Sequence, residues 1–250
     1  MISKNQIKII RSLKNKKSRI EHQCFVVEGT KSVLELIAVF QVEELYCTTQ
    51  WLNKHRDILP PQHTPQVISV REMEQISFQK TPQEVLAVCH LPEAHSECQL
   101  SNDTLYLALD GVQDPGNVGT IVRLADWFGI KRIYASTDVA DVFAPKCVQA
   151  TMGSLARVEV IYTDLAQLFA THKHIPIYGT HLEGTNLYET EFSARGVIVM
   201  GSEGQGISRK IEPYLTQRLL IPHYSQTPEK AESLNVAIAA AIVCAEFRRR

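Results

Sequence analysis

Hydrophobic residues in the second half of the chain fall into short runs that alternate with segments of helical periodicity. Six runs after residue 104 have the length of strands, and helical patterns separate most of them. Because nearly every residue in these runs is apolar, the predicted strands are buried on both faces, as in a parallel sheet covered by helices. The pattern predicts strands at 105–110, 132–136, 157–162, 175–180, 196–201 and 218–222, with helices at 117–128, 163–171 and 233–248.

The first ninety or so residues carry a shorter α/β pattern. Strands are expected at 24–29, 43–47, 66–70 and 84–89, with one helix beginning near Thr30 and a short helix between the last two strands. A polar stretch without apolar periodicity follows, which is typical of a linker. We therefore predict an α/β protein with a small N-terminal domain at 1–92, a linker at 93–103 and a second domain at 104–250.

Composition places the chain among ordinary globular proteins. Hydrophobic residues make up 44% and charged residues 21% of its 250 residues. The longest apolar run, 236–245, is too short to span a bilayer, and the basic N-terminus lacks the apolar segment of a secretory signal. The six cysteines are scattered and form no CxxC pair, which favours reduced thiols over disulfides or a zinc site. We expect a cytoplasmic protein with no membrane segment and no metal ion.

The net charge of −1 conceals an uneven distribution. Residues 1–92 carry 12 Lys and Arg against 9 Asp and Glu, and the first 19 residues hold seven basic side chains and no acidic one. Such a run can follow a phosphate backbone. A solvated helix face at a frayed terminus explains it as well, so charge alone leaves RNA binding open.

Unusual polar residues gather after four of the predicted strands. The segments that follow residues 110, 180, 201 and 222 are rich in Gly, Asn, Ser and acidic residues. Ligands of open parallel sheets bind beyond the carboxyl ends of the strands. We therefore expect these four loops to share one edge of the sheet and to form the functional site.

The first of these loops leads into a helix that carries a candidate arginine. Glycines and Pro115 impose a tight path on residues 111–116, and Asn117 is placed to cap the helix. Helical spacing puts Arg123 two turns inside, on the face nearest the strand ends. Two interpretations stay open for Arg123: a functional residue, or a surface partner of Asp126 three residues on.

Two further segments carry candidate chemistry. Residues 201–208 read G-x-x-G-x-G, which is not the dinucleotide fingerprint and lacks the Gly-Lys-Ser/Thr of a P-loop. They predict a backbone-rich cradle for an adenine or ribose around Glu203, unless the glycines only supply positive φ. The segment 233–248 predicts a buried helix, because it is apolar almost all round, with Ser233 and Asn235 as caps that also serve function.

Together these segments resemble the three motifs of the SpoU/TrmH branch of the SPOUT methyltransferases. The stretch 109–130 is similar to the first motif through Asn117 and Arg123, and 197–208 to the second through Glu203. Ile-Pro followed by Ser233 and Asn235 is similar to the third motif. Residues 19–37 resemble the RNA substrate-binding domain that often precedes this catalytic domain. The resemblance covers nearly the whole chain.

The resemblance implies an RNA methyltransferase that moves a methyl group from S-adenosylmethionine to a ribose 2′-hydroxyl of rRNA or tRNA, rRNA being favoured. It implies a homodimer with the active site near the subunit interface, and a C-terminal trefoil knot, a feature that is otherwise very rare. By similarity the catalytic residues are Arg123, Asn117, Glu203, Asn235 and Ser233. The cofactor contacts fall on Gly201, Ile221 and Leu234, chiefly through backbone groups, with Thr180 as a further candidate.

The sequence departs from the family at one point and leaves two rival functions. His223 and Tyr224 follow the Ile-Pro where Met and Gly are common, and the loop to Ser233 is longer. A non-catalytic RNA-binding protein could keep the fold, but the joint presence of four motif residues speaks against it: Asn117, Arg123, Glu203 and Asn235. The order of the glycines speaks against a dinucleotide-dependent oxidoreductase.

Overall fold

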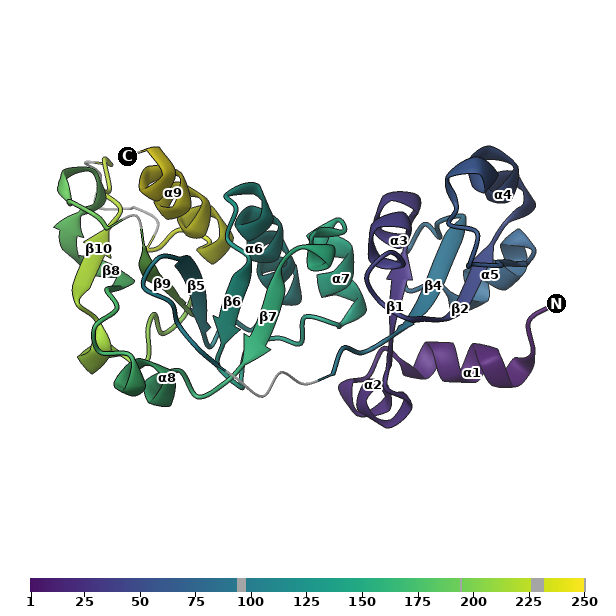
Figure 1. Cartoon of the computed structure of the whole chain (residues 1–250), viewed down its shortest axis with the longest axis horizontal. Helices are drawn as coiled ribbons and strands as arrows, with labels where there is room; N and C mark the ends of the chain where they lie inside the picture. The colour runs from purple at the N-terminus through teal and green to yellow at the C-terminus, as the bar shows by residue number, and fades with distance from the viewer. Residues whose placement is uncertain (94–97, 194, 226–231, 250) are drawn as a thin grey trace. The chain divides into compact units, whose positions relative to one another are not determined.

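A computed structural model of the chain describes residues 1–93, 98–193, 195–225 and 232–249 (Figure 1). The chain divides into two compact units, each with its own sheet. The first comprises Met1–Ala94 with Asp141–Ala156, and the second His95–Ala140 with Arg157–Arg250. Part of the predicted linker (94–97) and part of the long loop after Tyr224 (226–231) lie outside the described residues.

The first unit is built on a mixed four-stranded sheet in the order β1-β4-β2-β3. Strand β4 runs antiparallel to both of its neighbours, and β3 runs parallel to β2. The predicted strand at 66–70 is wrong beyond Val67, because Ser69 and Glu72 form a capping box that starts helix α5 at Val70. The strands are β1 (Cys24–Glu28), β2 (Val42–Cys47), β3 (Gln66–Val67) and β4 (Val85–His90).

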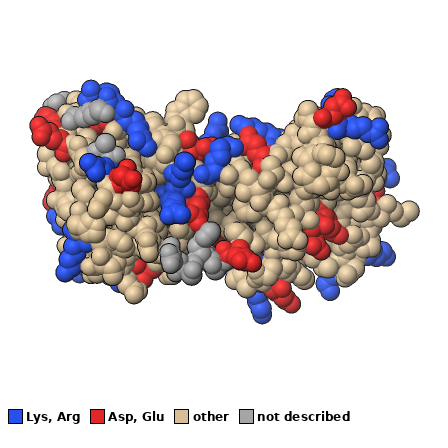
Figure 2. Space-filling model, in the orientation of Figure 1, with Lys and Arg blue, Asp and Glu red and all other residues tan. Residues whose placement is uncertain are grey.

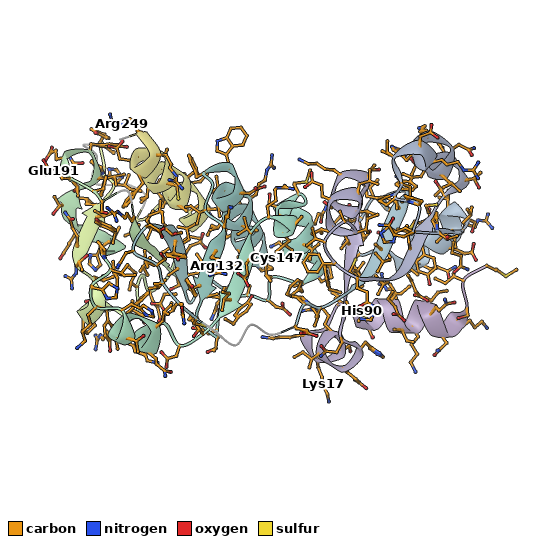
Figure 3. All side chains as sticks on the ribbon, viewed as in Figure 1. Lys17, His90, Arg132, Cys147, Glu191 and Arg249 are labelled. Atoms are coloured by element: carbon orange, nitrogen blue, oxygen red, sulfur yellow. The ribbon has the colours of Figure 1, made fainter. Side chains whose placement is uncertain are left out.

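The helices of this unit include the two that the sequence pattern predicted, α3 and α5, and others that it did not. Helix α1 begins with a capping box on Ser3 and buries Ile10, so the basic run lies partly on a helix that is capped and not frayed at its start. The lysines of this region stay on its surface, and Lys17 extends away from α2 into solvent (Figure 3). The helices of this unit are α1 (Lys4–Ser12), α2 (Lys16–His22), α3 (Thr30–Leu36), α4 (Thr49–His55), α5 (Val70–Ile76) and α7 (Pro145–Thr151).

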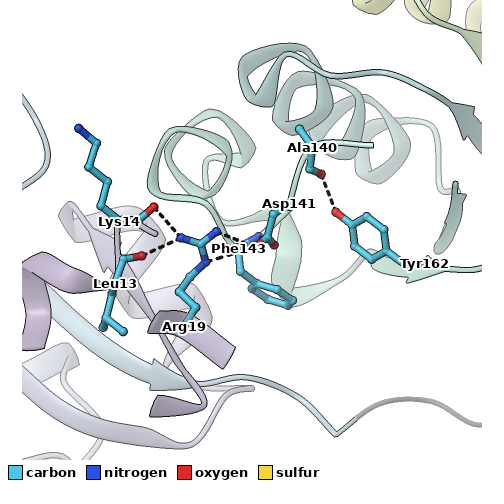
Figure 4. A network of polar contacts seen from close by, with 7 residues as sticks. All are labelled: Leu13, Lys14, Arg19, Ala140, Asp141, Phe143 and Tyr162. Carbon is cyan, nitrogen blue, oxygen red and sulfur yellow. Dashed lines mark hydrogen bonds and ion pairs between the residues drawn. The ribbon is translucent and has the colours of Figure 1, made fainter. Parts of the chain in front are cut away.

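Arg19 is the exception among the basic residues of the N-terminal run. Its side chain is 3% exposed, and its guanidinium lies 2.6 Å from a carboxylate oxygen of Asp141 (Figure 4). It also donates to the backbone carbonyls of Leu13 and Lys14 at 2.7 and 2.9 Å. Removal of one partner from a buried ion pair typically costs about 3–5 kcal/mol. Arg19 therefore holds the first unit together and is not available to a phosphate.

The segment Asp141–Ala156 packs within the first unit, although the sequence pattern places it inside 104–250. Asp141 accepts a hydrogen bond from the amide of Phe143 at 2.9 Å, and the Phe143 ring lies 4.8 Å from that of Phe25. Helix α7 packs against β1, with Cys147 buried (Figure 3). The division of function at the linker 93–103 stays a prediction.

The second unit contains a six-stranded sheet in the order β10-β8-β9-β5-β6-β7. Every neighbouring pair is parallel, which confirms the predicted all-parallel sheet. The central strands β5 and β9 are buried at every residue, as their continuous apolar runs require. The strands are β5 (Leu105–Asp110), β6 (Arg132–Ala135), β7 (Glu159–Tyr162), β8 (Ile177–Asn186), β9 (Gly196–Gly201) and β10 (Gln217–Leu220).

Three helices cover this sheet: α6 (Pro115–Trp127), α8 (Leu165–Thr171) and α9 (Val236–Arg249). Helix α8 packs on one face through Leu165 and Phe169, and α6 and α9 pack against each other on the opposite face (Figure 1). Helix α9 is buried on one side only, since Ile238 is 54% exposed. The prediction of a fully buried final helix is therefore wrong on that side.

Strand β8 is longer than predicted. Arg218 of β10 pairs with Gly179, but the next residue, Leu219, pairs with Thr185, so residues 180–184 bulge out of the ladder. A Cβ atom on Gly184 would lie 2.6 Å from the carbonyl oxygen of Arg218, so the bulge needs glycine at this position. The predicted loop after residue 180 is thus an interruption within a strand.

The distribution of surface charge and the state of the cysteines in the described residues do not by themselves indicate a binding site. Figure 2 shows Lys and Arg mixed with Asp and Glu over the viewed face, without a continuous basic field. All six cysteines are free, and burial raises the pKa of the Cys89 thiol to about 12, which keeps it protonated. In the described ranges no helix is long and apolar enough to span a membrane, and no three His, Cys, Asp or Glu residues gather as metal ligands would.

Candidate active site

The first loop and the glycine loop begin side by side at the carboxyl edge of the second sheet. Asp110 ends β5 directly opposite Gly201, which ends β9. The Asp110 side chain is buried, and its Oδ2 accepts a hydrogen bond from the amide of Ser208 at 2.6 Å. Asp110 thereby ties the far end of the glycine loop back to β5. The sequence analysis missed this residue; the available signal was a carboxylate at the end of an apolar strand.

Two of the three glycines of the loop 201–208 are required for different structural reasons. Ser202 and Gly206 exchange two backbone hydrogen bonds of 2.9 Å each, which closes the loop, and Gly206 has φ +68°. A Cβ on Gly201 would lie 2.2 Å from the carbonyl carbon of Gly206, whereas one on Gly204 would meet nothing within 4 Å. Positive φ therefore accounts for only one of the three glycines, and close backbone approach accounts for another.

Three polar residues from three loops meet above this edge. Oε1 of Glu203 accepts hydrogen bonds from the side-chain amides of Asn117 and Asn235 at 2.9 and 2.7 Å. The Asn235 amide also donates to Oδ1 of Asn117 at 3.0 Å. We call this set the Asn117–Glu203–Asn235 network. It shows that the sheet brings these three predicted site residues together.

The two asparagines differ in their capping roles. Of the two predicted caps of α9, Asn235 is confirmed, because its Oδ1 accepts from the amides of Ala237 and Ile238 at 3.0 and 3.3 Å. The prediction for Ser233 is wrong, since α9 begins at Val236 and Ser233 forms no capping hydrogen bond with a described residue. The expectation that Asn117 caps α6 is wrong. Asp114 is the cap and accepts from the amide of Asn117 at 2.9 Å, with Pro115 as the first helical residue. The Asn117 side chain is thereby left for Glu203.

Arg123 lies on the exposed face of α6, in line with Trp127, which is 83% exposed. Asp126 forms its ion pair with Arg157, with N···O distances of 2.8–3.0 Å, so the alternative of an Arg123–Asp126 pair is not observed. No described residue forms a hydrogen bond or ion pair with the Arg123 guanidinium. Arg123 does not touch the Asn117–Glu203–Asn235 network and lies about 12 Å along the helix from its start.

The remaining predicted residues border the same edge. Ser233 is exposed, and its hydroxyl has no hydrogen-bond partner among the described residues. The backbone groups of Ile221 and Leu234 likewise form no turn or loop hydrogen bond with a described residue. Thr180 donates to the carbonyl of Val199 at 3.3 Å. The edge thus offers backbone groups to a ligand. His223 and Tyr224 are exposed, but the loop beyond them includes residues outside the described ranges.

Comparison with known families decides the assignment. The model of the SpoU rRNA Methylase family matches residues 104–245, more than half of the chain. The chain belongs to this family. A second model, the MRM3-like substrate binding domain, matches residues 4–87. The resemblance found in the three motifs and in residues 19–37 is confirmed.

Individual relatives agree with this assignment over the full length. The 23S rRNA (guanosine(2553)-2′-O)-methyltransferase RlmP of Bacillus subtilis is 31% identical over 98% of this chain and 97% of its own. A TrmH-family protein from Porphyromonas gingivalis is 44% identical, with a TM-score of 0.86 over 100% and 99% of the two chains. An rRNA methyltransferase from Sinorhizobium meliloti, solved with AdoMet bound, is 26% identical, with a TM-score of 0.84 over 100% and 97%.

Family membership makes this SpoU protein an RNA methyltransferase that uses S-adenosylmethionine. The dinucleotide-dependent oxidoreductase considered from the glycine pattern is therefore excluded. The same finding favours a catalytic protein over an RNA-binding protein that has lost activity, since hydrogen bonds connect one residue from each of the three motifs, Asn117, Glu203 and Asn235.

Proposed function

We propose that this SpoU protein transfers the methyl group of S-adenosylmethionine to a ribose 2′-hydroxyl of 23S rRNA. The observation that carries the proposal is the Asn117–Glu203–Asn235 network, which joins all three family motifs at the carboxyl edge of a parallel sheet. The proposed substrate follows from the relatives RlmP and RlmB, whose names specify 23S rRNA 2′-O-methylation.

The geometry of the glycine loop fits a compact nucleoside cofactor. The loop is closed on itself, and its first residue, Gly201, has no room for a side chain. We assign cofactor binding to backbone groups of Gly201, Ile221 and Leu234, with Thr180 beside them. The backbone groups of Ile221 and Leu234 form no turn or loop hydrogen bond with a described residue, so they are available to the cofactor. Bound S-adenosylmethionine supplies an electrophilic methyl group on a sulfonium.

The protein must position and activate a poor nucleophile. A ribose hydroxyl loses its proton during transfer, and correct alignment supplies much of the rate. We do not assign Arg123 as the base, because a guanidinium has no acceptor for the proton. We assign Arg123 to binding the adjacent RNA phosphate and to stabilising the developing alkoxide, with proton loss through the phosphate or water. Its guanidinium, which has no hydrogen-bond or ion-pair partner in the described ranges, suits this role.

The Asn117–Glu203–Asn235 network has a supporting role in this scheme. Because none of its members contacts Arg123 in the structure, we assign it to fixing the glycine loop against the starts of α6 and α9. Ser233, two residues before Asn235, is exposed at the same edge, where its hydroxyl is available to substrate. All five residues thus belong to the proposed catalytic site.

We further propose that the protein acts as a homodimer with its active site near the subunit interface. Neighbouring helices α6 and α9 expose Trp127 and Ile238, and Leu234 precedes α9 with 47% of its surface exposed. Leu234 and Ile238 lie four residues apart at the start of α9, and exposed apolar side chains that cluster in this way mark interaction surfaces. The trefoil knot stays a prediction from the family. Five buried free thiols fit a reducing compartment, and we propose the cytoplasm.

The purified protein is expected to bind S-adenosylmethionine and S-adenosylhomocysteine but not NAD. The closed G-x-x-G-x-G loop lacks the helix N-terminus that holds a pyrophosphate in dinucleotide sites. Isothermal calorimetry with each ligand measures this directly, with circular dichroism as a check that the protein is folded. Heat with NAD and none with S-adenosylmethionine would remove the basis of the proposed function.

A further inference from the structure

The first unit contains a cavity of about 690 Å³, within the range of about 300–1,000 Å³ that is usual for ligand pockets. Four chain segments line it: the end of α1 with the residues just after it, strand β1, the turn at 78–83 that precedes β4, and the start of α7. All of them belong to the first unit, so the cavity is separate from the site at the edge of the second sheet. No function described above uses it.

Basic side chains dominate the charge of this cavity. Arg11, Lys14, Lys80 and Lys146 line it, against a single acidic residue, Glu28. Lys14 and Lys80 are exposed, and their ammonium groups form no hydrogen bond or ion pair with a described residue. The electrostatic character of the cavity is therefore suited to an anion.

Glu28 is already engaged in the structure. Its two carboxylate oxygens accept hydrogen bonds from the Ser77 hydroxyl at 2.5 Å and the Phe78 amide at 2.8 Å. Burial raises the pKa of Glu28, and these two hydrogen bonds and the nearby Arg11 guanidinium oppose that rise. Glu28 thus fixes the turn that carries Phe78, and the four basic residues of the cavity still outnumber it.

Aromatic and aliphatic side chains line one part of the cavity, beside the basic residues. Val26 and Val148 are 2% and 1% exposed, and the ring of Phe78 is half-buried beside them. The Arg11 guanidinium lies 5.4 Å from the centre of this ring and donates to the carbonyl of Ser77 at 2.6 Å. One guanidinium donor out of five is used in this bond, so the others remain for a ligand.

Aromatic rings flanked by cations bind single-stranded nucleic acid, because bases stack on the ring while the cations hold the phosphates. We propose that this cavity binds one unpaired nucleotide of the RNA substrate, with its base against Phe78 and its flanking phosphates held by Arg11, Lys14 and Lys80. A base within a helix is stacked and paired and cannot enter such a cavity, so the ligand is an unpaired nucleotide. The inference rests on the proposed function only in naming RNA as the substrate.

The full-length protein provides the test, with a short fluorescein-labelled RNA of mixed sequence as the probe, either single-stranded or annealed to its complement. Fluorescence anisotropy at several salt concentrations gives the Kd. The double variant Lys14→Ala/Lys80→Ala is expected to weaken single-strand binding about tenfold and to lower the salt slope by about 1.4, which is about 0.7 for each lost phosphate contact. The matched control Lys54→Ala removes an exposed lysine of α4 outside the cavity and should change the Kd less than about twofold.

The variant Phe78→Leu tests whether the cavity binds a base by stacking or only attracts RNA through its positive charge. It keeps an apolar side chain in a half-buried position, so the fold is retained, which thermal unfolding checks. Loss of stacking is expected to weaken single-strand binding about tenfold with an unchanged salt slope, and to affect the duplex much less. Wild-type affinity of Phe78→Leu for the single strand would overturn the inference, as would equal losses for single strand and duplex.

The same preparations distinguish this inference from the proposed function. S-adenosylmethionine binding and methyl transfer to rRNA are measured on the wild type in parallel. If the wild type transfers no methyl group but its RNA affinity depends on Lys14, Lys80 and Phe78, the proposed function is refuted and the cavity remains an RNA-binding site. Normal methyl transfer, together with an RNA affinity that does not change when these three residues are replaced, would refute only the proposal that the cavity binds RNA.

Discussion

Replacement of Arg123 by alanine is expected to lower kcat about 10²–10³-fold, the usual loss when one transition-state stabiliser is removed, with S-adenosylmethionine affinity nearly unchanged. The structure supports a role toward a ligand, because the guanidinium is exposed on α6 and has no partner among the described residues. Asp126, its possible partner by sequence spacing, is occupied by Arg157. Single-turnover methylation of rRNA measures the chemical step.

Two further variants define the role of Arg123. Arg123→Lys is expected to restore little activity, since an ammonium cannot reproduce the planar two-pronged contact to phosphate. Arg157→Ala is the matched control: it removes a half-exposed arginine from a surface ion pair, and should leave kcat near wild type and cost at most about 1 kcal/mol of stability. Near-wild-type turnover of Arg123→Ala would show that Arg123 has no part in the chemistry.

Gly201→Ala is expected to weaken S-adenosylmethionine binding about 100-fold. Its new Cβ would lie 2.2 Å from the carbonyl carbon of Gly206 and 2.3 Å from the amide nitrogen of Ile207. Both are backbone atoms that cannot move aside cheaply, and relief of such a clash costs about 1–3 kcal/mol. Opening of the loop would break the Ser202–Gly206 pair and displace Glu203 from the two asparagines.

The loop itself provides the control for this substitution. Gly204→Ala places a methyl group in open space at a residue without positive φ, and should change cofactor affinity less than about twofold. Calorimetric titration of both variants with S-adenosylmethionine makes the comparison. Equal affinities for the two variants would mean that closure of the loop at Gly201 is irrelevant to cofactor binding.

The sheet of the second unit could be predicted because the sequence of its central strands shows that they are buried on both faces. Strands β5 and β9 are apolar at nearly every position, and such runs fold only where both faces are covered. The gathering of Asn117, Glu203 and Asn235 followed from their positions after strands, since the carboxyl ends of parallel strands share an edge. The order of the strands, which makes Asp110 and Gly201 neighbours, has no local signature.

One feature that escaped prediction depends on partners distant in sequence. The Arg19–Asp141 pair joins residues 122 positions apart, and it draws a segment between β6 and β7 into the first unit. A basic residue in a basic run gives no sign that it will be buried. The capping error at α6 was avoidable, since Pro115 marks the first helical residue and points to Asp114 as the cap.

Methyl transfer by the purified protein to rRNA, followed by mass spectrometry of the released nucleosides, tests the central claim most directly. With S-adenosylmethionine labelled in its methyl group, the label is expected in a 2′-O-methylated nucleoside from 23S rRNA, and Arg123→Ala should abolish nearly all of it in the same time. Label on a base, or no label in rRNA from a protein that binds the cofactor, would contradict the proposed ribose methylation.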